Sequence, residues 1–198
     1  MRSDQSGARP ARAGYCSLVT AGLALMALVP GRGSARTQES VQVRALTSLD
    51  LERYSGRWYE VARLPNRFQR RCVADVTADY ELRPDSSLRI VNGCRTVEGD
   101  RLRAEGKARM ADRRGPASQL KVRFAPAVLS FLPMVWADYW VLDLTDDYGA
   151  ALVGTPDRRY LWVLSRTPTL DETIYQRLIE TATRQGFDVS NLIRSAAP

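Results

Sequence analysis

The feature that most constrains this chain is a series of eight short strand-like runs between residues 57 and 165, each separated from the next by turn-forming residues. Proline, glycine and aspartate mark the turns, as in Arg83-Pro84-Asp85 and Thr155-Pro156-Asp157, because these residues favour tight-turn backbone angles. The runs are 57–64, 73–82, 88–94, 102–111, 119–124, 139–144, 148–154 and 160–165. This near-regular spacing predicts an all-β sandwich or barrel of meandering antiparallel strands.

Several runs alternate between apolar and polar residues, which indicates that one face of each strand is buried. Leu120, Val122 and Phe124 alternate with Lys121 and Arg123. A barrel needs this period of two, because alternate side chains point inward. The run 102–111 places small residues on its apolar face, namely Ala104, Gly106 and Ala108. Small inward residues leave either an interior cavity or room for a tapered, packed barrel.

One helix is predicted after the strands. Residues 171–185 place Ile174 and Leu178 at helical spacing, Thr169 or Asp171 can cap the start, and Gly186 can end it. Residues 187–193 are interpreted as a short final strand or an extended tail. Residues 36–48 have no strong pattern and are interpreted as a linker, which leaves 49–195 as the folded domain.

Residues 1–35 have the pattern of a secretory signal peptide. A basic start precedes the apolar stretch 15–29, and Gly33-Ser34-Ala35 supplies small residues for cleavage. A transmembrane anchor is the alternative, although Pro30-Gly31 ends the stretch early. Cys16 lies at the start of the apolar run, whereas an acylated lipoprotein cysteine would follow it. We therefore expect an exported protein, periplasmic or membrane-associated, without a lipid anchor.

The charge pattern argues against nucleic-acid binding. Removing residues 1–35, which hold four arginines and one aspartate, lowers the formal net charge from +7 to +4. The remaining charges of both signs are interleaved, and Arg113-Arg114 and Arg158-Arg159 are isolated pairs. A nucleic-acid protein usually carries a clustered basic stripe. We predict no nucleic-acid partner.

The cysteine and histidine contents exclude most site chemistry. Cys72 and Cys94 remain after processing, and an even count in an exported domain predicts a disulfide. Both are even-numbered and lie on the apolar faces of their strands. The chain has no histidine, which removes the commonest metal ligand and general base. We predict no metal, no cofactor and no catalytic residue.

Three sequence signatures occur in order along the runs. They are Gly56-Arg57-Trp58-Tyr59-Glu60, Thr145-Asp146-Asp147-Tyr148 and Leu161-Trp162-Val163-Leu164-Ser165-Arg166-Thr167-Pro168. Together they resemble the three characteristic regions of the lipocalin family, in its bacterial lipocalin and apolipoprotein D branch. The resemblance covers residues 49–193. It implies an eight-stranded antiparallel up-and-down barrel with one C-terminal α-helix packed outside.

The resemblance also assigns structural roles. The counterpart of Trp58 seals the closed end of the barrel, and the counterpart of Arg166 lies across its indole, where a planar, weakly hydrated cation is favourable. The predicted structural residues are Gly56, Trp58, Asp146, Tyr148 and Arg166.

The resemblance implies binding and transport or storage of small hydrophobic ligands in the cell envelope, with fatty acids or lysophospholipids as candidates. If Trp58 points inward, alternation predicts which other residues line the cavity, although each could equally serve ordinary core packing. They are Glu60, Ala62, Leu64, Ala78, Tyr80, Leu88, Ile90, Asn92, Met110, Phe124, Trp140, Leu142, Tyr160 and Trp162. Buried Glu60 and Asn92 need polar partners, either a lipid head group through water or each other.

Two other functions are considered, a lipocalin-fold enzyme and a ligand-free interaction module that uses the barrel as a scaffold. The connection from Pro126 to Trp136 is also unusual, because it is almost wholly apolar. It is interpreted either as a lid over the mouth or as a segment that contacts an anionic membrane. Arginines of the neighbouring connections would ring the same mouth, namely Arg67, Arg70, Arg71, Arg101, Arg158 and Arg159. The sequence makes no prediction of oligomeric state.

Overall fold

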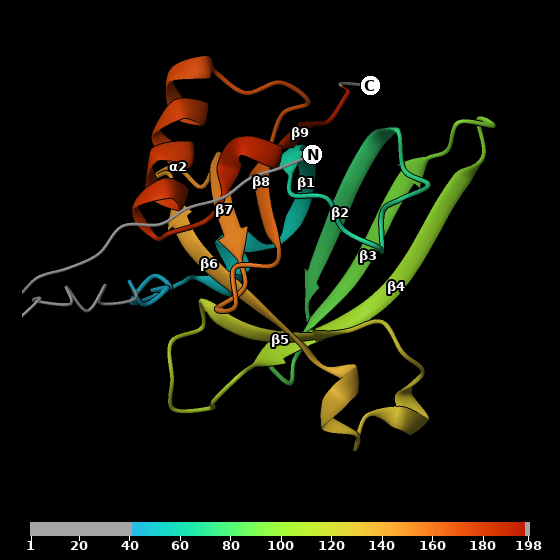
Figure 1. Cartoon of the computed structure of the whole chain (residues 1–198). Helices are drawn as coiled ribbons and strands as arrows, with labels where there is room; N and C mark the ends of the chain where they lie inside the picture. The colour runs from blue at the N-terminus through green and yellow to red at the C-terminus, as the bar shows by residue number, and fades with distance from the viewer. Residues whose placement is uncertain (1–40, 197–198) are drawn as a thin grey trace, which may run out of the picture. The chain divides into compact units, whose positions relative to one another are not determined.

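The computed structural model describes residues 41–196, and the predicted signal peptide and residues 36–40 of the predicted linker lie outside this range. Consecutive strands pair antiparallel from β1 to β8, and β8 pairs with β1 (Figure 1). The strands are β1 (Gly56–Arg63), β2 (Ala74–Leu82), β3 (Leu88–Arg95), β4 (Arg101–Met110), β5 (Gln119–Arg123), β6 (Ala137–Leu144), β7 (Ala150–Gly154) and β8 (Leu161–Ser165). The predicted eight-stranded antiparallel barrel is confirmed, and the sandwich alternative is wrong.

The predicted helix is α2 (Glu172–Arg184). The Asp171 side chain caps it by accepting from the backbone N–H groups of Thr173 and Ile174. Gly186 ends it with a φ of +80°, which favours glycine. The shorter helical elements are α1 (Leu51–Tyr54), η1 (Ala127–Leu129), η2 (Pro133–Val135) and η3 (Val189–Asn191).

The C-terminal segment completes the barrel seam. β1 pairs with β2 only from Gly56 to Tyr59. Further along, β9 (Ile193–Arg194) pairs with Ala62 and Arg63 of β1, and Ala196 forms a bridge to Ala74 at the start of β2. The extended tail predicted after the helix therefore lies between β1 and β2 in the half of the barrel away from Trp58.

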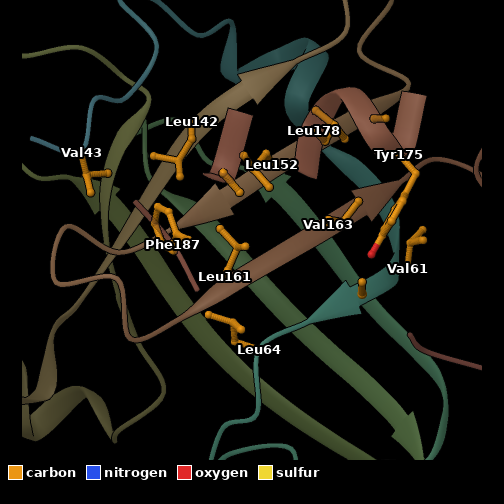
Figure 2. Packing of buried hydrophobic residues seen from close by; sticks show 13 residues of the cluster. Val43, Val61, Leu64, Leu142, Leu152, Leu161, Val163, Tyr175, Leu178 and Phe187 are labelled. Atoms are coloured by element: carbon orange, nitrogen blue, oxygen red, sulfur yellow. The ribbon is translucent and has the colours of Figure 1, made fainter. Parts of the chain in front are cut away.

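The chain buries two separate hydrophobic clusters. The interior cluster fills the barrel around Trp58, Tyr80, Leu120 and Val153. The helix-side cluster lies between α2 and the outer face of the strands (Figure 2). Its labelled members are Val43, Val61, Leu64, Leu142, Leu152, Leu161, Val163, Tyr175, Leu178 and Phe187. Strands beneath α2 are therefore buried on both faces.

The segment before α1 is docked on the barrel. Val43 is buried in the helix-side cluster. The Leu46 N–H donates to the carbonyl oxygen of Val141 at 2.9 Å, and the Ser118 hydroxyl donates to the Leu46 carbonyl oxygen. Residues 43–46, within the predicted linker, are thus part of the folded unit.

Trp58 and Arg166 close one end of the barrel. Trp58 is fully buried, and the Arg166 Cζ lies 3.9 Å from its ring centroid. Arg166 also donates to the carbonyl oxygens of Arg57 at 2.9 Å and Arg53 at 2.7 Å. Gly56 has a φ of +99°, and a Cβ there would lie 3.2 Å from Arg166 Nη1. Glycine is therefore required by both its backbone angle and the approach of Arg166.

The turn between β6 and β7 belongs to the same closed end. Arg53 stacks 3.9 Å from the Tyr148 ring centroid and donates to the Asp146 carbonyl oxygen at 3.0 Å. The Tyr148 hydroxyl accepts from the Asp50 N–H at 3.1 Å. The three sequence signatures thus meet in space around one buried tryptophan.

The predicted disulfide is confirmed. Cys72 and Cys94 are bonded, with their Cα atoms 5.5 Å apart. The bond ties the connection between β1 and β2 to the end of β3. It therefore restrains the half of the barrel that Trp58 does not fill.

Candidate functional site

An irregularity in β1 changes which of its residues face the interior. Glu60 is opposite Leu164, but Ala62 is opposite Val163, so Val61 is an extra residue, a β-bulge. Residues opposite each other share a face of the sheet. Leu164 belongs to the interior cluster and Val163 to the helix-side cluster.

The bulge overturns two predictions. Ala62 and Leu64 belong to the helix-side cluster, so the prediction that they line the interior is wrong. Uninterrupted alternation from Trp58 cannot anticipate an inserted residue. The same bulge places Arg63 on the interior face, opposite Trp162.

The prediction for β6 is also wrong in its choice of face. Leu142 packs in the helix-side cluster (Figure 2). Trp140 packs against that cluster and lines an outer hollow of about 400 Å³ with residues 41–43 and Arg158. Tyr139 and Val141 belong with the interior cluster instead. The strand is apolar on both faces because barrel and helix bury both, so alternation gives no signal for direction.

The closed half of the interior is filled. Of the predicted lining residues, Tyr80, Leu88 and Ile90 are buried in the interior cluster, and Ala78 and Met110 pack against it. Other buried residues, which were not among the predicted lining residues, complete the filling, namely Tyr54, Ala108, Leu120, Val141, Val153 and Leu164. This half is a packed core.

Three tyrosines form a buried hydroxyl cluster within it. The Tyr139 hydroxyl is 2.8 Å from that of Tyr54 and 2.9 Å from that of Tyr80. Burial raises the pKa of all three phenols, and that of Tyr80 reaches about 12. We call Tyr54, Tyr80 and Tyr139 the tyrosine triad.

The open half of the interior stays accessible. Ala104 on β4 lies opposite inward-facing Asn92 and is exposed, and Gly106 is half-buried. Phe124 is 44% exposed and lies over Gly106, where a Cβ would come within 2.8 Å of its ring. Glycine at 106 thus makes room for Phe124. The Asn92 Oδ1 atom is buried and has no hydrogen-bond partner among residues 41–196.

An aromatic group borders this open half. The rings of Tyr160 and Trp162 are stacked with centroids 5.9 Å apart, and Phe68 lies 5.5 Å from Tyr160. Arg67 lies 5.1 Å from the Phe68 centroid, and Arg159 lies 5.7 Å from that of Tyr160. The predicted lining residues Tyr160 and Trp162 therefore lie at the mouth, near Arg67 and Arg159. Phe68, which was not predicted, is their neighbour.

A polar network lies on the inner face of β1. The buried Glu60 carboxylate accepts from Arg63 Nη1 at 2.9 Å, from the Ser195 hydroxyl at 2.6 Å and from the Gln69 amide. Gln69 in turn accepts from the Trp162 indole N–H at 3.0 Å. The interpretation that Glu60 pairs with Asn92 is wrong. Arg63, Gln69 and Ser195 carried no sequence signal, because the contacts join segments far apart in the chain.

The apolar connection between β5 and β6 projects from the barrel (Figure 1). Val128 is 75%, Phe131 75% and Met134 86% exposed. Trp136 is held on the outer face by Arg109, whose Cζ lies 4.2 Å from its ring centroid. A lid would pack its apolar side chains over the mouth, so that interpretation is wrong.

None of the predicted ligand residues lines the hollow on the outer face of β1–β4. This hollow measures about 660 Å³, and two of its four arginines are closely paired, Arg57 with Asp79 and Arg89 with Glu105. Within residues 41–196 no cluster of acidic, histidine or cysteine side chains could hold a metal ion. No helix in this range is long and apolar enough to cross a membrane.

Comparisons with known proteins agree with this architecture. The family model for the lipocalin-like domain matches residues 49–197. Temperature-induced lipocalin-1 of Arabidopsis thaliana is 42% identical over 155 residues, covering 78% of this chain and 82% of the relative. Outer membrane lipoprotein Blc of Escherichia coli K12 is 41% identical over 152 residues, covering 76% and 81%. Apolipoprotein D of Mus musculus is 28% identical over 153 residues, covering 73% and 75%.

Solved structures share the fold at low sequence identity. Insecticyanin from the tobacco hornworm Manduca sexta superimposes with a TM-score of 0.62 at 20% identity, covering 78% of this chain and 84% of that one. Apocrustacyanin C2 gives a TM-score of 0.60 at 17% identity, covering 75% and 80%.

The tyrosine triad predicts a loss of stability at alkaline pH. The phenol of an unfolded tyrosine has a pKa of about 10, whereas burial raises the pKa of Tyr80 to about 12. The unfolded chain therefore releases protons that the folded state retains. The stabilisation is complete below about pH 10 and is lost as the pH rises toward about 12.

Urea denaturation across this window measures the effect, and Tyr139→Phe is the matched variant. We expect the free energy of unfolding to fall less steeply with pH in the variant than in the parent. Identical pH dependence in both proteins would contradict the assignment.

Proposed function

Because the chain belongs to the lipocalin family, we propose that its barrel binds a small hydrophobic molecule in the open half and transports or stores it. The observation that carries this proposal is the asymmetry of the interior. The half next to Trp58 is packed, while Ala104 and Gly106 leave the inner face of β4 accessible beneath Phe124. An accessible, mainly apolar interior with few polar groups is typical of ligand-binding sites.

The residues that line the open half favour a single-chain lipid such as a fatty acid or lysophospholipid. Tyr160 and Trp162 offer apolar faces for an alkyl chain, and each buried methylene contributes about 0.8 kcal/mol. Arg67 and Arg159 beside these rings would attract an anionic or zwitterionic lipid to the mouth. The packed closed half limits how deep the lipid can enter the barrel.

The alternatives receive less support. An enzyme needs a free nucleophile or base, but Cys72 and Cys94 are bonded and the three donors to Glu60 occupy that carboxylate. An interaction module would be favoured by a filled interior, which describes only the closed half. The relative Blc is named an outer membrane lipoprotein, which supports an envelope location for this chain, exported by residues 1–35.

Ligand binding should be visible through one tryptophan. Trp162 faces the open half whereas Trp140 lies outside the barrel. Titration with a long-chain fatty acid or a lysophospholipid should therefore change Trp162 emission, with micromolar or tighter affinity, about −8 kcal/mol or stronger. Trp162→Phe should lose most of the change, and the control Trp140→Phe should keep it. If neither lipid class alters emission or thermal stability, binding in the open half is refuted.

We also propose that the connection from Pro126 to Trp136 contacts an anionic membrane. Exposed Val128, Phe131 and Met134 form an apolar tip, and an apolar tip near basic side chains is favourable at an anionic interface. The connections at the open end, or the residues beside them, carry five exposed arginines, namely Arg67, Arg70, Arg71, Arg101 and Arg159. The sixth, Arg158, donates a hydrogen bond to the Gln185 carbonyl oxygen. Docking there would let lipid enter the barrel without crossing water.

Vesicle binding tests this contact. The double variant Phe131→Asp with Met134→Asp should sharply reduce salt-sensitive binding to anionic vesicles, because it removes the apolar tip. The remaining cations near the surface contribute only about 1 kcal/mol each. The matched control, Phe131→Leu, Met134→Leu, keeps the tip apolar and should bind like the parent. The aspartate variant should retain its affinity for monomeric lipid. Undiminished vesicle binding by the aspartate variant would show that the tip does not dock.

A further inference from the structure

Arg63 is a buried cation on the interior face of the barrel. The bulge at Val61 turns it inward opposite Trp162, and only 8% of the residue is exposed. Arginine is rarely buried to this extent unless its charge is paired and its donors are bonded. The partners of its guanidinium therefore indicate what this position is built to hold.

The guanidinium is only partly paired. Nη1 donates to Glu60 Oε1 at 2.9 Å. Nε is buried without a partner, and Nη2 makes no hydrogen bond to any residue in the range 41–196. A buried donor without a partner is costly. The edge formed by Nε and Nη2 therefore has no partner among residues 41–196.

Two other arginines show what this edge binds. Arg57 holds Asp79 through Nε at 2.8 Å and Nη2 at 3.1 Å. Arg89 holds Glu105 through Nε and Nη2, both at 2.6 Å. In each pair the Nε–Nη2 edge clamps two oxygens of one carboxylate, a geometry that also fits phosphate.

Glu60 does not compete for this edge. Its carboxylate already accepts from Arg63 Nη1, from the Gln69 amide and from the Ser195 hydroxyl. The network therefore holds Glu60 in place on one side of the guanidinium. The opposite side keeps two directed donors for another anion.

We propose that Arg63 is the head-group site of the barrel, where the Nε–Nη2 edge binds the carboxylate or phosphate of a single-chain amphiphile. This rests on the proposed binding function and specifies its ligand as an anion. The alkyl chain of this amphiphile would lie along Trp162 and Tyr160, which stack beside Arg63 toward the mouth. Exposed Arg67 and Arg159 attract the anion to the mouth.

Three twelve-carbon probes test the proposal, dodecanoate, dodecyl phosphate and the uncharged dodecanol, each titrated by Trp162 emission. Arg63→Gln should weaken binding of either anion by about tenfold or more, because it removes charged hydrogen bonds, and should weaken dodecanol binding much less, because the hydroxyl carries no charge. Glu60→Gln should strengthen anion binding, because the guanidinium then lacks its protein counter-ion. The anion with the larger loss in Arg63→Gln identifies the head group.

A double variant, Glu60→Gln with Arg63→Gln, guards against misfolding because it leaves no unpaired buried charge. The parent should prefer the anions to dodecanol, and the double variant should lose that preference while still binding dodecanol. An unchanged preference for either anion in the double variant would overturn the head-group site. Failure of all three probes to bind the parent would instead refute the proposed binding function, so the two failures are distinguishable.

Discussion

The stacking of Arg166 on Trp58 is the interaction on which the rest of the structure depends. It joins the strand that begins the barrel to the segment that follows its last strand, and the guanidinium also binds the backbone of Arg53 and Arg57. Replacing a large buried aromatic residue costs about 3–5 kcal/mol. Because this cluster and the tyrosine triad fill one half of the interior, the proposed ligand would enter through the other half.

Burial on two faces explains the arrangement of that other half. β1 and β6 carry apolar residues both into the barrel and toward α2, and each contains a register shift, at Val61 and Leu142. The shift in β1 sends Ala62 to the helix and Arg63 to the interior. A packing requirement outside the barrel thus places a cation inside it, beside the aromatic residues of the mouth.

The sequence predicted most of the fold because its signals are local. Turn residues located all eight strands to within a few residues, Asp171 and Gly186 bounded the helix, and two cysteines predicted the disulfide. The inward face was predictable only where a strand alternates, as around Leu120. The prediction of the inward face was wrong for Trp140 and Leu142, because they lie on a strand that is buried on both faces. The Glu60 network escaped prediction because Gln69 and Ser195 reach it from distant segments.

We propose that the open half of the barrel holds an amphiphilic cargo. Native mass spectrometry of the protein purified from its own host tests this most directly, combined with organic extraction of the same sample. We expect a mass increase of one small lipid, which extraction removes and identifies as a single-chain anionic amphiphile. Protein that carries no small molecule, and to which none of the extracted host lipids binds, would contradict it.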